Sequence, residues 1–220
     1  MRLFLHNQTV CTRDTLFTTE TYINLFPNRH LLLIYLLHLI NFSGTHCAAW
    51  FDILNYTNFR LEDEAGVKNS HHVINELIEK EISTGIEASR IMLGGMSLGG
   101  AQAIYTTLKS KHTLGGLVAF STFLPLRTEF CSFLPHLAHE FGVPTDCPPL
   151  SNSGVPCLQV HGDLDAIVPL EFLGRPTSVV LDKLFTDFKF KVYKGLNHAT
   201  SSEELVYVKA FINKHLPGNK

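Results

Sequence analysis

A serine set between glycines, Ser97 in the run GMSLG at residues 95–99, is the side chain best placed to do chemistry in this sequence. The apolar residues 90–93 before it predict a buried strand, and residues 98–109 after it predict a helix. A G-x-S-x-G turn between a strand and a helix lifts the serine hydroxyl above the sheet, where it can attack a carbonyl. The other interpretation is a structural glycine turn, because a Cβ would clash where strand and helix meet closely.

The next residue, Leu98, predicts the second component of such a site. Its backbone N–H stands at the N-terminus of the expected helix and points into the space above Ser97. A carbonyl attacked by a serine develops negative charge on its oxygen, and a backbone N–H in this position stabilises it. Leu98 is therefore the predicted oxyanion donor.

An acid is expected from the run VHGDLDAIVP at residues 160–169, where a predicted strand ends. Asp163 and Asp165 compete for the role. We favour Asp165, which lies further past the strand and precedes an apolar turn. Asp163 is expected to cap the turn by accepting hydrogen bonds from local backbone N–H groups. His161 is expected to pack beneath the loop.

A base is expected at His198, in the run KGLNHATS at residues 194–201. It follows a predicted strand and precedes the last helix, where Ser201 and Glu204 have the spacing of a capping box. From there it would accept the proton of Ser97 while Asp165 holds its tautomer. The chain order Ser, Asp, His is the order of an α/β hydrolase.

Strands that alternate with helices predict the elements that position these residues. The fold class is α/β, a single domain over 1–220 with a mostly parallel sheet and helices on both faces. Functional groups gather at the carboxyl ends of such strands. Helices are predicted over 67–82, 98–109, 179–188 and from 201 onward, strands over 90–93, 117–120, 157–160 and 188–193, and an irregular loop or cap over 131–156.

Composition limits the classes of function. The chain has 220 residues, 45% of them hydrophobic, which is enough for a sizeable core. Its net charge of −2 argues against nucleic-acid binding, because no basic surplus would neutralise phosphates. Five cysteines, an odd number, fit a reducing compartment, so we expect a cytoplasmic protein. His136 and His139 have a spacing that could bind a metal, but they lack an obvious third ligand, so no metal is expected.

One apolar run, residues 31–42 (LLLIYLLHLINF), complicates that expectation. A membrane-spanning helix needs about 20 apolar residues, and this run is shorter and contains His38 and Asn41. We favour a buried element. A membrane anchor and a wrongly assembled stretch of chain are the alternatives.

Five blocks of the sequence resemble the acyl-protein thioesterases, in the lysophospholipase and carboxylesterase-like branch of the α/β hydrolases. In the family's order they are AWFDI (49–53), RIMLGGMSLGGAQAIYT (90–106), GGLVAFSTFLPLR (115–127), CLQVHGDLDAIVPLEFLG (157–174) and VKAFINKHLP (208–217). The resemblance implies a cytosolic serine hydrolase without a cofactor, with Ser97, Asp165 and His198 as catalytic residues. It implies S-acylated proteins or lysophospholipids as substrates, and it allows transient contact with a membrane surface.

A chain that binds long acyl groups needs an apolar groove. Candidates are aromatic and aliphatic residues at the end of the third block and just after it, which could equally be ordinary core. They are Phe123, Leu124 and Phe130, with Phe133 and Leu134 beyond them.

The sequence departs from the family over residues 1–48, and the family-like part is 49–217. Family members begin with a strand that ends in a His-Gly-Leu-Gly-Asp type of loop, which gives a second oxyanion donor. Here LFLH at 3–6 resembles the end of that strand, but residues 7–10 (NQTV) replace the glycines. The N-terminal strands are therefore expected to be divergent or missing. The alternative function is a catalytically weak or inactive acyl-binding homologue.

Overall fold

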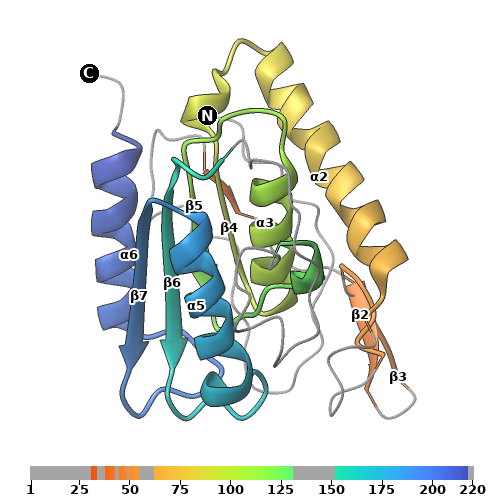
Figure 1. Ribbon diagram of the computed structural model, residues 1–220, viewed down its shortest axis with the longest axis vertical. Coiled ribbons are helices and arrows are strands. Elements are labelled where there is room, and N and C mark those ends of the chain that lie inside the picture. Colours follow the sequence, from red (N-terminus) through yellow and green to blue (C-terminus); the bar gives the residue numbers. More distant parts are fainter. Residues whose placement is uncertain are drawn as a thin grey trace.

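The centre of the molecule is a five-stranded sheet in the order β1-β4-β5-β6-β7, with every neighbouring pair parallel (Figure 1). The computed structural model describes residues 31–33, 38–42, 45–48, 50–54, 62–130 and 152–217, and for the first three ranges the backbone alone. The strands of the sheet are β1 (Leu31–Leu33), β4 (Met92–Met96), β5 (Gly116–Phe120), β6 (Pro156–Gly162) and β7 (Asp187–Tyr193).

Helices lie between the strands along the chain or follow the last one, as the alternating pattern predicts for a parallel sheet. They are α2 (Glu64–Ser83), α3 (Leu98–Lys109), α5 (Arg175–Leu184) and α6 (Ser202–His215), with short helical turns at Ala88–Arg90, Arg127–Glu129 and Leu170–Gly174. Together the alternation and the parallel register confirm the predicted α/β-hydrolase type of fold.

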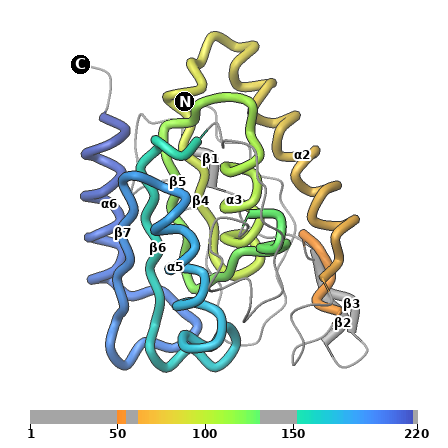
Figure 2. The backbone as a smooth tube through the Cα atoms, in the orientation of Figure 1, coloured from red at the N-terminus to blue at the C-terminus, as the bar shows by residue number. Residues whose placement is uncertain are grey.

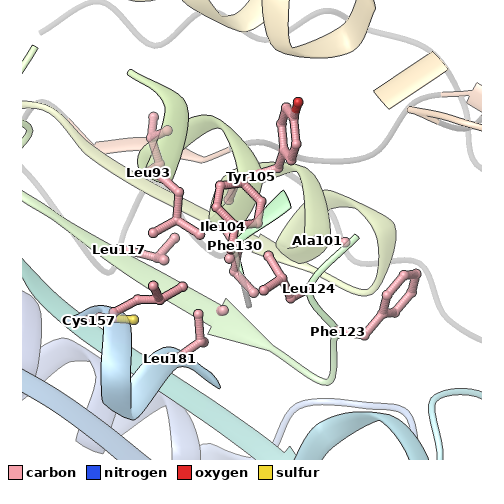
Figure 3. Close-up of a cluster of buried hydrophobic side chains, with 14 of the residues drawn as sticks. Leu93, Ala101, Ile104, Tyr105, Leu117, Phe123, Leu124, Phe130, Cys157 and Leu181 are labelled. Carbon is pink, nitrogen blue, oxygen red and sulfur yellow. The ribbon is translucent and has the colours of Figure 1, made fainter. Parts of the chain in front are cut away.

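Side chains of the central strands alternate between two hydrophobic clusters, because successive residues of a strand point to opposite faces. In β5, Leu117 and Ala119 join the larger cluster, while Val118 and Phe120 join the smaller one. Residues of α2, α3 and α5 complete the larger cluster, part of which Figure 3 shows. Residues of α6 complete the smaller one, and the chain trace places α6 on the opposite side of the sheet from α3 (Figure 2). Helices therefore cover both faces.

The helix before β7 differs from the prediction. The sequence pattern predicts it over 179–188, but α5 spans Arg175–Leu184 and follows the π-helical turn Leu170–Gly174. Proline at the first turn, Pro176, is a helix-start signal because its missing N–H is not needed there. Phe185 is already extended, so the chain reaches β7 at Asp187, one residue earlier than predicted.

The apolar run 31–42 contributes to two strands. Its first residues form β1, which pairs in parallel with β4, and its last form β2 (His38–Phe42), which pairs antiparallel with β3 (Thr45–Ala48). Among the helices of the described ranges, none is long and apolar enough to cross a membrane. The predictions for the first strand, for residues 131–151 of the loop or cap, and for the burial of this run fall outside the described residues.

Candidate active site

Ser97 stands in the sharp turn that the sequence predicts between β4 and α3. Its backbone has φ 55° and ψ −127°, a conformation that non-glycine residues rarely adopt. A Cβ built on Gly95 would lie 2.4 Å from the backbone carbon of Gly99, so glycine is required where the strand meets the helix. Ser97 itself remains partly exposed. The turn therefore has the form of a nucleophile elbow.

The neighbouring strand holds this turn in place. The N–H of Ser97 donates to the carbonyl of Phe120, the last residue of β5, at 3.0 Å. Its carbonyl accepts from the N–H of Ala101 at 2.9 Å and from the hydroxyl of Thr122 at 2.6 Å. Such a backbone conformation costs on the order of 1–3 kcal/mol, and it persists only where surrounding contacts fix it. These three bonds supply that restraint.

Asp165 and His198 are in direct contact. The Nδ1 atom of His198 lies 2.7 Å from Oδ2 of Asp165, although the two residues are 33 positions apart in the chain. The other carboxylate oxygen, Oδ1, accepts from the backbone N–H groups of Ile167 and Val168 at 2.9 and 2.8 Å. Asp165 is 4% exposed, so its carboxylate is fixed within the loop.

The electrostatics of this pair favour a charged acid. Burial raises the pKa of Asp165, but the hydrogen bonds from His198 and from the N–H groups of Val168 and Ile167 outweigh it and leave the pKa below the usual value. An ionised carboxylate only accepts, so Nδ1 of His198 carries a proton and donates. A neutral His198 then has its lone pair on Nε2, the arrangement that a general base needs.

His161 lies beneath the acid loop, which confirms the predicted packing. It is fully buried, its Nε2 lies 2.8 Å from the carbonyl of Val168, and Oδ2 of Asp165 is 3.6 Å from the same nitrogen. Burial lowers the pKa of His161, so the ring is neutral near pH 7 and its Nε2–H donates to Val168. His161 thus supports the loop that carries Asp165.

Asp163 has a different partner from the one predicted. Its Oδ1 accepts from the N–H of Gly195 at 2.6 Å, so it bonds the histidine loop and not its own turn. A second bond joins the same loops, from the N–H of Leu164 to the carbonyl of Leu196 at 2.9 Å. The prediction of a local cap was wrong because β6 and β7 are neighbours, which brings the loops after them side by side.

The C-terminal side of the histidine loop is fixed by the predicted capping box, which the structure confirms. The N–H of Glu204 donates to Oγ of Ser201, and the N–H of Ser201 donates to the Glu204 carboxylate. Glu204 is 1% exposed, and burial raises its pKa to about 7 against the lowering effects of the Ser201 N–H and the Lys191 charge. The spacing of Ser201 and Glu204 predicts the capping box, but it does not predict that the Glu204 carboxyl group is buried.

The structure brings Asp165 and His198 together and places Ser97 at the same carboxyl edge of the sheet. Within the ranges that the structure describes, the Ser97 hydroxyl makes no hydrogen bond, so none joins it to His198. Catalytic hydrogen bonds are often long in unliganded sites and tighten when substrate binds. Leu98 begins α3, where the first N–H groups have no partner within the helix.

The candidate acyl-binding residues lie in the core. Phe123, Leu124 and Phe130 are 8%, 3% and 2% exposed and belong to the larger hydrophobic cluster (Figure 3). Phe130 packs edge-on against Tyr105, with the ring centroids 5.7 Å apart. This placement agrees with the other interpretation of these residues, as ordinary core. Phe133, Leu134, His136 and His139 lie outside the described residues.

Comparisons with known proteins identify the family of the chain. The family model for phospholipases and carboxylesterases matches residues 35–216. Acyl-protein thioesterase 1 of Neurospora crassa is 34% identical over 79% of this chain and 68% of its own length, and that of Saccharomyces cerevisiae is 33% identical over 82% and 74%. The crystal structure of Arabidopsis thaliana SOBER1 superposes with a TM-score of 0.65 at 25% identity, covering 82% of this chain and 80% of that one. The chain is therefore a member of the phospholipase/carboxylesterase family of α/β hydrolases.

Proposed function

We propose that this chain is a serine hydrolase that cleaves long-chain acyl thioesters on protein cysteines, with carboxylesterase and lysophospholipase activity beside it. The observation that carries the proposal is the 2.7 Å contact between His198 and Asp165, set at the carboxyl edge of the sheet that also carries the Ser97 elbow. The names of the relatives, acyl-protein thioesterases, support the choice of substrate.

Each of these residues has a defined part in the proposed reaction. Ser97 Oγ attacks the acyl carbonyl, and His198 Nε2 takes the hydroxyl proton while Asp165 accepts from Nδ1–H. The N–H of Leu98 donates to the oxyanion. As the tetrahedral intermediate collapses, the carbon–sulfur bond breaks and His198 gives the proton to the leaving thiolate. Water, deprotonated by His198, then releases the fatty acid and restores Ser97.

The acyl chain needs an apolar surface near the elbow. Of the three candidates, Phe123 has the strongest case, since it directly follows Thr122 at the edge of the sheet and keeps 8% exposure. Leu124 and Phe130 are less exposed than Phe123, so they would contact only the far end of the acyl chain. A cytoplasmic location belongs to the proposal, because the described cysteine, Cys157, is a free buried thiol.

The first test is labelling with a fluorophosphonate, which reacts with activated serines. We expect strong labelling of the wild type and none of Ser97→Ala, since the mutant lacks the attacking oxygen. Hydrolysis of a palmitoyl-cysteine peptide and of a lysophospholipid by the wild type then ranks the two substrate classes. A folded wild type that is not labelled would contradict the proposal and support the weak or inactive acyl-binding homologue.

A further inference from the structure

The peptide unit between Ser97 and Leu98 has two ends with different tasks. In the proposed reaction its N–H, which belongs to Leu98, faces the oxyanion. Its carbonyl, which belongs to Ser97, points to the opposite side, because the two bonds of a planar trans peptide are antiparallel. Whatever fixes this carbonyl therefore fixes the direction of the N–H.

Two donors hold the carbonyl of Ser97. One is the N–H of Ala101 at 2.9 Å, the ordinary bond of a helix's first turn. The other is the hydroxyl of Thr122 at 2.6 Å, which comes from 25 residues further along the chain. The second bond is not required by α3 and is supplied by a different element.

Thr122 is held so that its hydroxyl reaches this carbonyl. Ser121, the residue before it, has φ 41° and turns the chain sharply after β5. Thr122 is fully buried, and its other acceptor, the carbonyl of Phe123, lies at a weak 3.5 Å. A Cβ built on Gly100 would lie 2.9 Å from the Thr122 Cβ, so this glycine leaves the space that the threonine side chain occupies.

We propose that Thr122 is a positioning residue for the oxyanion site: its hydroxyl clamps the Ser97–Leu98 peptide so that the Leu98 N–H stays aimed at the reacting carbonyl. The inference rests on the proposed function. A hydrogen bond to the carbonyl also polarises the peptide unit, which makes its N–H a better donor. Thr122 does not touch the substrate, and its effect passes through the backbone.

The effect should appear in the rate and not in the fold. When the hydroxyl is removed, the Ser97 carbonyl still accepts from Ala101, so no buried acceptor is left unpaired. Loss of a whole oxyanion donor costs about 10²–10³ in kcat, and a donor that is present but less well aimed should cost less, about tenfold.

The experiment compares proteins with and without the hydroxyl in two pairs. The first pair is the wild type and Thr122→Val, and the second is Thr122→Ser and Thr122→Ala. Thr122→Val replaces the hydroxyl with a methyl of similar size, and Thr122→Ser keeps it. Because valine could disturb this buried site, Thr122→Ala beside Thr122→Ser repeats the comparison without the methyl. Thermal unfolding shows which variants are folded, and kcat and KM are measured with a p-nitrophenyl ester.

We expect about a tenfold lower kcat in each chain without the hydroxyl, an unchanged KM, and near-wild-type kcat in Thr122→Ser. A long-chain alkyl trifluoromethyl ketone, which forms an oxyanion on Ser97, should bind more weakly by the same factor, while palmitate binds equally. Folded Val and Ala variants with wild-type kcat, or equal kcat in the Ser and Ala variants, would overturn the inference. A wild type without esterase activity would instead remove the proposed function and, with it, this inference.

Discussion

Asp163 and Asp165 lie two positions apart, yet their carboxylates have different tasks. Asp165 faces His198, and Asp163 faces the backbone N–H of Gly195. In the proposed reaction only Asp165 needs a negative charge, because it would fix the imidazole tautomer of His198 and stabilise the imidazolium that forms. Asp163 needs only an oxygen that accepts a hydrogen bond.

We expect Asp165→Asn to lower kcat by about 10³–10⁴ without unfolding the protein, because an amide opposite Nδ1 favours the wrong tautomer of His198. Asp163→Asn is the matched control. Its side-chain oxygen can still accept from Gly195, so esterase kinetics should stay within about threefold of the wild type. Equal losses in the two variants would show that the acid is not Asp165 alone.

These residue roles differ in how far sequence predicts them. Ser97, Asp165 and His198 follow from local motifs at strand ends, and the structure places Asp165 and His198 in contact. The contact of Thr122 with Ser97 crosses 25 positions, and that of Asp163 with Gly195 crosses 32. Such pairs depend on which strands are neighbours, and no local pattern encodes that.

At the scale of elements, the start of α6 carries a buried acid. Burial raises the pKa of Glu204 to about 7 from a usual 4.5, so the folded protein keeps this proton at pH values where the unfolded chain has lost it. The resulting stabilisation is complete below pH 4.5 and is lost as the pH rises through 7. Above that, an ionised carboxylate is buried at the helix start.

Glu204→Gln removes this titration and keeps an oxygen for the Ser201 N–H. The quantity compared is the free energy of unfolding of Glu204→Gln minus that of the wild type. This difference should be larger at about pH 8.5 than at about pH 5, by on the order of 3 kcal/mol. Urea unfolding at both pH values measures the difference. Glu203→Gln, on the exposed face of the same helix, should show little change. A difference for Glu204→Gln that does not vary with pH would contradict the argument.

The junction of β4 and α3 allows a steric test. Gly95→Ala would set a methyl 2.4 Å from the backbone of Gly99, so the strand and the helix have to separate. We expect fluorophosphonate labelling of Ser97 to fall by more than tenfold, because the elbow opens. Gly154→Ala is the control, since its Cβ would meet no atom of the described residues within 4 Å. Normal labelling of Gly95→Ala would refute the close packing.

Element boundaries were predicted best where one local signal dominates. The glycines before Ser97 and the Ser201 capping box gave α3 and the start of α6 as they stand in the structure. The pattern places the start of α5 too late, at 179, because the first four residues of the helix, 175–178 (RPTS), include no valine, leucine, isoleucine or phenylalanine and the apolar spacing begins only after them. Proline at the first helical turn was the better signal.

At the scale of the whole molecule, Cys157 reports on global unfolding. It is fully buried in the central sheet, and burial raises the pKa of its thiol well above the usual value. Modification by N-ethylmaleimide needs the thiolate, so we expect it only when the sheet opens. Peptide mass mapping after timed exposure separates Cys157 from the other cysteines. Rapid modification in the absence of denaturant would contradict the buried placement.

The fold class could be predicted because strand and helix patterns alternate from about residue 50 onward. The strand order could not, since β4, β5, β6 and β7 read alike as short apolar runs and their pairing depends on long connections. That both faces of the sheet are covered could also be predicted. The run 117–120 accordingly sends alternate side chains to two different cores.

The division of the site between strands has a consequence for biosynthesis. The proposed nucleophile follows β4, while the proposed acid and base follow β6 and β7, much later in the sequence. Chains are made from the N-terminus, and domains fold as they emerge. A growing polypeptide therefore exposes Ser97 long before it contains His198. In the proposed reaction, Ser97 can therefore attack an acyl group only after β6 and β7 have joined the sheet and brought Asp165 and His198 to it.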